Sequence, residues 1–201
     1  MKITLPENIS EITLGDYQQY EKLILRTDLS DKEMILRTVK IFTGLPFNQI
    51  SAMRYKDLES VVDILKTALQ TECKFVNRFT LNKVEFGFIP NFDDIKAKEY
   101  FDLSEYNDKT ENLHKLMAIL FRPINHTDAL GNYSIVEYQG SDEWSEVMKR
   151  TPLNVVNGAL GFFLTLSKEL QDYTQRYLKK DLPKKEQQPI TIMKNGDGTQ
   201  H

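Results

Sequence analysis

The sequence contains only one cysteine, and this scarcity limits the kinds of site that the chain can build. A lone Cys73 cannot form a disulfide within the chain, and it is compatible with a reducing compartment. Its neighbours Glu72 and Lys74 do not provide the electropositive setting of an activated thiol. We therefore interpret Cys73 as a partly buried structural residue.

Long apolar runs are missing as well. No segment approaches the roughly 20 apolar residues that a membrane-spanning helix needs. The N-terminal stretch MKITLPENIS reaches polar residues and a proline too early for a signal peptide. We expect no membrane partner, and we expect a protein that is made and used in the cytosol.

The chain lacks an excess of charge of one sign. Its 26 Lys and Arg residues are interspersed with 29 Asp and Glu residues, and the formal net charge is only −3. No sequence segment is basic enough to hold a phosphate backbone strongly, so direct nucleic-acid binding is disfavoured.

Metal-binding and cofactor-binding motifs are also absent. His114, His126 and His201 do not occur at the spacings of zinc ligands. The Asn-Gly-Asp-Gly stretch at 195–198 lacks the remaining ligands of a calcium loop. No glycine-rich phosphate loop or nucleophile elbow is present. We expect no metal, no cofactor and no catalytic residue.

Four carboxylates keep one catalytic alternative open. Asp93, Asp94, Asp102 and Glu105 lie close together in the sequence and could form a carboxylate site of a small enzyme. Acid–base work needs such groups to face one another, which spacing alone does not establish. Charged loop surface is the preferred interpretation.

What the sequence has in abundance is helical periodicity. The strongest pattern runs from Thr151 to Tyr177, and Gly158 and Gly161 inside it predict close approach of another backbone. A capping box, Ser30 to Glu33, opens another helix that ends at Gly44. Further helices are expected over 14–25, 57–71, 113–121 and 142–148.

A smaller part of the chain has β character. Aromatic and β-branched residues over 74–81 and 83–89 predict a hairpin that turns at Asn82 and Lys83, with Gly87 as a bulge. Another strand is expected over 133–138, and an exposed loop over 125–132. The fold class that follows is α+β, predominantly α-helical, with a helical core and a small antiparallel hairpin or sheet. We expect one domain over 1–178, with an N-terminal arm over 1–13, and a polar C-terminal tail over 179–201.

Three segments, in this order, carry a resemblance to a known group of proteins. They are FDLSEY at 101–106, AILFRPI at 118–124 followed by YSIVEYQG at 133–140, and PLNVVNGALGFF at 152–163. In order and spacing they resemble small proteins of tailed bacteriophages that are encoded among the head and tail genes. The resemblance covers roughly Leu58 to Leu178.

The resemblance implies a non-enzymatic structural or assembly protein that acts through protein–protein contacts in head–tail or tail assembly. Its partners would be other phage structural or tail proteins, or further copies of itself in a ring. It would work in the host cytoplasm during assembly and could remain in the virion. A chaperone and a virion subunit are both open, and the alternatives of another class are a host-directed binding module and the small enzyme.

The candidate interaction residues are the aromatic side chains of the middle segment and an apolar patch in the tail: Phe75, Phe79, Phe86, Phe88, Tyr100, Phe101, Ile190, Ile192 and Met193. A hairpin that is marginal alone, and a tail with one apolar patch, suit a subunit that neighbouring proteins complete.

Overall fold

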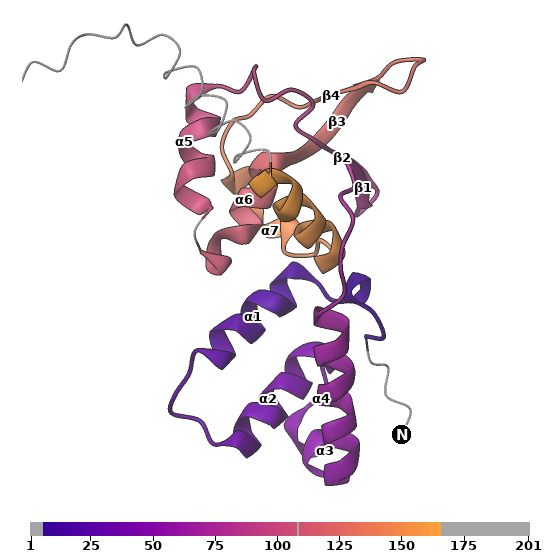
Figure 1. The fold of residues 1–201 in the computed structure, drawn as a ribbon, viewed down its shortest axis with the longest axis vertical. Helices are drawn as coiled ribbons and strands as arrows, with labels where there is room; N and C mark the ends of the chain where they lie inside the picture. Colours follow the sequence, from indigo (N-terminus) through magenta and orange to yellow (C-terminus); the bar gives the residue numbers. More distant parts are fainter. Residues whose placement is uncertain (1–5, 108, 166–201) are drawn as a thin grey trace, which may run out of the picture. The chain divides into compact units, whose positions relative to one another are not determined.

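A computed structural model describes residues 6–107 and 109–165 of the chain (Figure 1). Its elements are, in order, η1 (Ile9–Glu11), α1 (Leu14–Ile24), α2 (Asp31–Thr43), α3 (Phe47–Ser51), α4 (Tyr55–Leu69), β1 (Arg78–Leu81), β2 (Val84–Phe88), α5 (Ala97–Tyr106), η2 (Thr110–Asn112), α6 (Leu113–Leu120), β3 (Phe121–Thr127), β4 (Tyr133–Ile135) and α7 (Asp142–Met148). Residues 153–165 are helical as well. The predicted α+β class with a helical majority is confirmed.

The chain divides into two compact units, Met1–Phe162 and Phe163–His201. The predicted domain boundary at residue 178 lies outside the described residues. The predicted tail over 179–201, with Ile190, Ile192 and Met193, lies outside the described residues, as do the first five residues of the predicted arm. The following account concerns the first unit.

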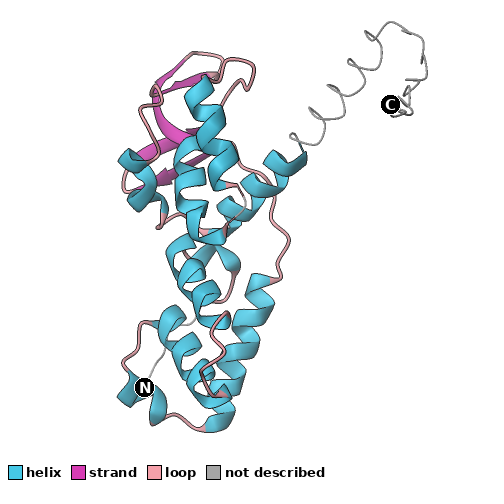
Figure 2. Ribbon diagram, turned by 90° about the vertical axis from the view of Figure 1, so that its left-hand side faces the viewer, coloured by secondary structure: helices cyan, strands magenta, loops and turns pink. Residues whose placement is uncertain are grey.

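Helices α1 to α4 make up the helical region, residues 14–69 (Figure 2). Ser30 and Glu33 form the predicted capping box at the start of α2, and Gly44 ends this helix with a φ of 67°. A small aliphatic core joins α2, α3 and α4. Its buried members are Val39, Ile50, Leu58, Val61 and Leu65.

The four strands form one antiparallel sheet in the order β1-β2-β3-β4. With helices α5 to α7 and the helical residues up to Phe162, it makes up the sheet region, residues 78–162. Asn82 and Lys83 form the hairpin turn with φ values of 50° and 66°, which gives the backbone twist that two-residue hairpins favour. The predicted hairpin is therefore completed by two further strands of the same chain.

Strand β3 corrects two predictions. Phe121 begins a strand rather than ending a helix, and residues 125–127 belong to that strand rather than to a loop. The strand contains Pro123, which cannot donate to a ladder. Its carbonyl nevertheless accepts a 2.9 Å hydrogen bond from the Val136 amide, and a register shift follows at Ile124. Such a shift is the setting in which a sheet tolerates proline.

Gly87 is not the bulge that the sequence predicted, because its pairing with both neighbouring strands is regular. The reason for glycine is a close aromatic side chain. A Cβ added at Gly87 would lie 2.4 Å from the ring of Tyr133. That ring lies against the sheet with its hydroxyl donating to the Phe88 carbonyl at 2.8 Å and with the Arg78 guanidinium 4.4 Å from its centre.

Backbone hydrogen bonds tie the start of α1 to the segment before the helix that begins at residue 153. The Leu14 amide donates to the Thr151 carbonyl at 2.9 Å, and the Leu153 amide donates to the Ile12 carbonyl at 2.8 Å. A backbone bridge joins Thr13 and Pro152 between them. These residues are distant in the sequence, so the pairing joins the helical and sheet regions.

The predicted close approach at Gly158 is confirmed. A Cβ there would meet the carbonyl oxygen of Lys74 at 2.4 Å. The same prediction is not borne out at Gly161, because no atom of the described residues lies within 4 Å of a Cβ added there. The helix therefore needs a glycine at position 158, where the connection from α4 to β1 passes it at Lys74.

Candidate functional site

An open groove of about 570 Å³ lies along α1 and α2. Its α1 wall consists of Gln19, Lys22, Leu23 and Arg26, which follow the i, i+3, i+4, i+7 spacing of one helix face. The stripe thus extends from the middle of α1 to just beyond its C-terminus.

The second wall has the same spacing. It consists of Arg37, Lys40, Ile41 and Gly44, from α2 and its C-cap, and Phe47 at the start of α3 lines the groove as well. Two helical stripes of equal length therefore border one trough. We call this set of nine residues the basic groove.

Every charged side chain that lines the basic groove is a cation. Arg26 pairs with Asp28, at 2.5 Å, on the connection between α1 and α2. The Lys40 ammonium lies 4.5 Å from the centre of the Phe47 ring, which is 40% exposed. Among the described residues no carboxylate lies within 4 Å of Lys22 or Arg37. The groove thus combines an apolar floor with positive charge that the chain itself only partly compensates.

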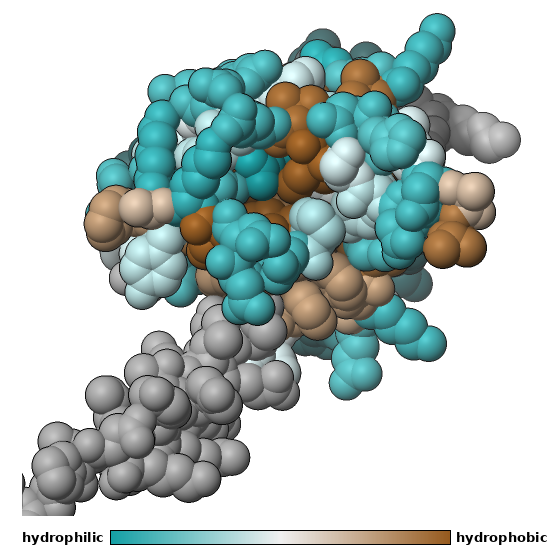
Figure 3. All heavy atoms as spheres, turned by 90° about the horizontal axis from the view of Figure 1, so that it is seen from above, coloured by the Kyte–Doolittle hydropathy of each residue, from teal (hydrophilic) through white to brown (hydrophobic). Residues whose placement is uncertain are grey.

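Tyr100 and Phe101 form a second exposed feature, on α5. Both belong to the predicted interaction residues, and they are 59% and 66% exposed. Their ring centres are 6.2 Å apart with the ring planes at 66°. The face viewed in Figure 3 carries scattered apolar groups among hydrophilic side chains. Tyr100 and Phe101 thus present a small aromatic surface on one helix.

The other predicted interaction residues that the structure describes lie inside a network of rings. Phe86 and Phe88 are buried, and Phe75 and Phe79 are half-buried. Phe79 stacks on Phe86 at 5.6 Å and meets Phe121 edge to face at 5.0 Å. The sequence does not distinguish an aromatic residue that faces a partner from one that faces its own sheet. Phe86 and Phe88 leave almost no surface for a partner.

Asp94 and Asp102, two carboxylates of the enzyme alternative, have different hydrogen-bond partners. Asp94 accepts a 2.6 Å hydrogen bond from the Asn91 amide in an exposed turn. Asp102 accepts a 2.5 Å hydrogen bond from the Tyr138 hydroxyl, and burial together with this acceptor raises the pKa of Tyr138. In residues 6–107 and 109–165 no three His, Cys, Asp or Glu side chains gather in a way that could hold a metal ion.

A different carboxylate, Glu99, forms the buried ion pair of the sheet region. Its Oε1 lies 2.7 Å from Nη2 of Arg122, although the two groups are not aligned as a hydrogen bond. Both side chains are at least nine-tenths buried. Burial lowers the pKa of Arg122, and the facing Glu99 carboxylate opposes that effect. The Glu99 side chain also accepts from the Lys96 amide at the start of α5, which explains its position within the fold.

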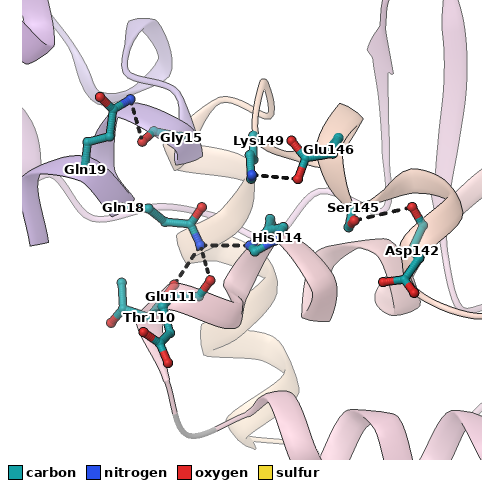
Figure 4. Close-up of polar contacts among 10 residues, drawn as sticks. All are labelled: Gly15, Gln18, Gln19, Thr110, Glu111, His114, Asp142, Ser145, Glu146 and Lys149. Carbon is teal, nitrogen blue, oxygen red and sulfur yellow. Dashed lines mark hydrogen bonds and ion pairs between the residues drawn. The ribbon is translucent and has the colours of Figure 1, made fainter. Parts of the chain in front are cut away.

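Gln18 and His114 form the polar contact between α1 and α6 (Figure 4). The Gln18 amide donates to the carbonyls of Thr110 and Glu111, at 2.8 and 3.0 Å, and lies 3.1 Å from Nδ1 of His114. With the amide as donor, Nδ1 is the acceptor and the neutral imidazole carries its proton on Nε2. Burial and the nearby Lys149 lower the pKa of His114.

The environment of Cys73 agrees with the structural interpretation of this residue. Its thiol is half-buried and contacts the Thr71 carbonyl at 3.3 Å, and burial raises its pKa. A raised pKa reduces the reactive thiolate.

Comparison with family models, with curated proteins and with solved structures gives no match. Within the described part of the chain, no helix is both long and apolar enough to cross a membrane. The basic groove was not among the sequence-based candidates. The cations Lys22, Arg26, Arg37 and Lys40 do recur at steps of three and four on two helices, which is the signal that could have indicated it.

Proposed function

We propose that the protein is a non-enzymatic bacteriophage structural or assembly protein that acts through protein–protein contacts in head–tail or tail assembly. Support comes from the order of the three segments that resemble small phage proteins. It also comes from the surfaces described above, which suit binding of another chain.

The single observation that carries the proposal is the exposure of Phe101. This residue opens the first of the resembling segments, FDLSEY, and is 66% exposed, whereas Leu103 in the same segment is buried. Packing within the chain accounts for Leu103. It does not account for Phe101, because an exposed phenylalanine forgoes about 2 kcal/mol of burial free energy. Tyr100 beside it has the same property, and rigid aromatic residues are typical anchors of protein interfaces.

The test places a photo-crosslinking amino acid at position 101 of the full chain in phage-infected cells. Tyr55 offers a matched control, because it is 65% exposed on α4 and precedes the part of the chain that carries the resemblance. We expect position 101, and not position 55, to crosslink to a phage-encoded head or tail protein identified by mass spectrometry.

Two other results would decide against the proposal. Equal crosslinking at both positions would show that exposure alone governs the reaction. Crosslinking at position 101 only to a host protein would favour the host-directed binding module. The enzyme alternative predicts that the carboxylates are needed for activity. It is rejected if Asp93→Asn and Asp102→Asn leave every measured function unchanged.

A chaperone and a virion subunit differ in whether the protein is present in the finished phage particle. Mass spectrometry of purified particles distinguishes them, because a chaperone leaves the finished particle and a subunit stays at a fixed copy number.

A further inference from the structure

We infer that the basic groove binds an acidic amphipathic helix of a partner protein. This inference rests on the proposed function, because it names the chemistry of one partner of the assembly protein. The surface is distinct from Tyr100 and Phe101, which lie on α5 in the sheet region.

The shape of the groove favours a helix as its occupant. Each wall is a stripe of residues spaced i, i+3, i+4, i+7 along a helix and the one or two residues that follow it, so each extends about 10 Å at 1.5 Å per residue. Two such stripes form the surface into which the side-chain ridge of a third helix packs. A ridge of two turns, with apolar residues at the same spacing, matches the length of the trough. Helix-in-groove recognition commonly uses such anchors.

The floor of the groove specifies apolar anchors. Leu23 is buried, Ile41 is half-buried, and Phe47 is partly exposed. The aliphatic stems of the flanking lysines add apolar surface while their ammonium groups reach water. Leucine or methionine side chains on the partner helix would therefore be buried against apolar surface, and no unpaired polar group would be buried with them.

The walls specify negative charge on both sides of that ridge. Lys22 and Arg26 belong to the α1 wall, and Arg37 and Lys40 to the α2 wall. Asp28 compensates Arg26 through the ion pair and also faces Arg37, as does Glu33. The described chain leaves Lys22 and Lys40 without a carboxylate within 4 Å. Glutamates flanking an apolar ridge would meet these two ammonium groups from opposite sides.

A nucleic acid fits the groove less well than an acidic helix. Duplex DNA presents one phosphate for about every 1.7 Å of its axis, and strong binding needs many cations along a continuous path. Here four cations surround an apolar floor of Leu23, Ile41 and Phe47, which no phosphate would contact favourably.

The experiment measures binding of a fluorescent peptide to the full chain by anisotropy. The probe is a helix of about 16 residues with leucines at i, i+3, i+4 and i+7 flanked by glutamates. Its control carries lysine in place of each glutamate. A third probe is a fluorescent DNA duplex of about 20 base pairs.

Two matched double variants test where the peptide binds. Lys22→Glu with Lys40→Glu reverses one charge on each wall, and both side chains are exposed, so the fold should persist. Lys56→Glu with Lys66→Glu makes the same charge change on exposed positions of α4, outside the groove. Circular dichroism of both variants checks that each retains its helical content.

We expect the acidic peptide to bind, and to bind about tenfold more weakly to the groove variant than to the α4 variant. Its affinity should also decline as salt concentration rises. Phe47→Ser should weaken binding in a salt-independent manner, because it removes part of the apolar floor.

Four results would overturn the inference. They are absence of binding, equal binding of the lysine peptide, equal affinity of the two double variants, and tighter binding of the DNA duplex. Sedimentation of the protein alone tests whether a second copy of the chain occupies the groove. A dimer that the groove variant abolishes would show this and would also overturn the inference. Failure of the groove inference would leave the crosslinking result at position 101 unaffected, and the reverse holds too.

Discussion

The helical region and the sheet region bury their apolar side chains in different ways. The helical region has an aliphatic core of five buried residues contributed by α2, α3 and α4, which follow one another in sequence. The sheet region is built around phenylalanines from three strands, with Phe86 and Phe121 fully buried and Trp144 of α7 packed edge to face on Phe86. One core depends on neighbours in sequence, and the other on distant segments.

The difference teaches where this chain can present surface to other molecules. Short helices with a small core turn only a narrow stripe inward. This leaves the α1 and α2 stripes of the basic groove open, with Lys22 and Lys40 exposed. The sheet region uses most of its aromatic side chains internally, and Tyr100 and Phe101 on α5 are more exposed than Phe162, the other exposed aromatic residue described in this region.

The largest expected effect is a loss of stability caused by a substitution in the core of the sheet region. Phe121→Ala should lower the free energy of unfolding by about 3–5 kcal/mol, because it empties a fully buried site among the rings of Phe79 and Phe88. Chemical denaturation measures this change, and Phe101→Ala, at an exposed site, should change it by less than about 0.5 kcal/mol. Hydrogen exchange sharpens the comparison. If Phe121→Ala removes protection equally from α2 and α4, the two cores are one cooperative unit rather than two.

The second effect concerns the buried ion pair. Glu99→Gln leaves the Arg122 guanidinium buried without its counter-charge, and we expect a loss of about 3 kcal/mol in unfolding free energy. The exposed pair of Lys96 and Glu137 gives a control, because Glu137→Gln should cost less than about 1 kcal/mol. Equal losses would show that burial does not govern the strength of these pairs.

An intermediate effect is expected at Gly158. Gly158→Ala should lower the unfolding free energy by about 1–3 kcal/mol, because the added carbon would collide with the backbone carbonyl of Lys74. Gly161→Ala makes the same change where no atom of the described residues lies within 4 Å, and it should be neutral or stabilise by up to about 1 kcal/mol. A similar response at both glycines would contradict the role of the close backbone approach.

The smallest effect lies at the contact between the regions and depends on pH. The folded state lowers the pKa of His114 from its ordinary 6.5, so it resists protonation more than the unfolded state does. Stability should therefore be complete above about pH 6.5 and decline as the pH falls below it. Burial is the largest cause of the lowered pKa, and the positive charge of Lys149 adds to it. The unfolding free energy of His114→Gln, measured by denaturation at a series of pH values, should change less with pH in this range than that of the unmodified protein.

The sequence predicted the parts of the fold that rest on local patterns. A helix expected over 14–25 is α1 (Leu14–Ile24), and one expected over 57–71 is α4 (Tyr55–Leu69). The turn at Asn82 and Lys83 was also correct. Each of these depends on periodicity, capping or turn chemistry within a few residues.

Strand β3 escaped prediction because its signals conflict. Leu116, Met117, Leu120 and Phe121 continue a helical spacing, and Pro123 argues against an internal strand. Pairing of Phe121 with Phe88 on β2 decides the outcome, and that partner is distant in sequence. The basic groove was missed for a related reason. Each wall is visible as a stripe, but only the folded chain shows that the two stripes face the same trough.

The backbone pairing of residues 12–15 with residues 149–153 has a consequence for synthesis on the ribosome. The Leu14 amide cannot form its hydrogen bond to the Thr151 carbonyl until residue 151 has been synthesised. That residue is translated roughly 140 residues later, which takes on the order of 10 seconds at usual elongation rates. During that interval α2 to α4 can already close their own core, because its members follow one another in sequence. The nascent chain therefore exposes the beginning of α1 until the sheet region is nearly complete, and this interval is the period in which a ribosome-associated factor could reach it.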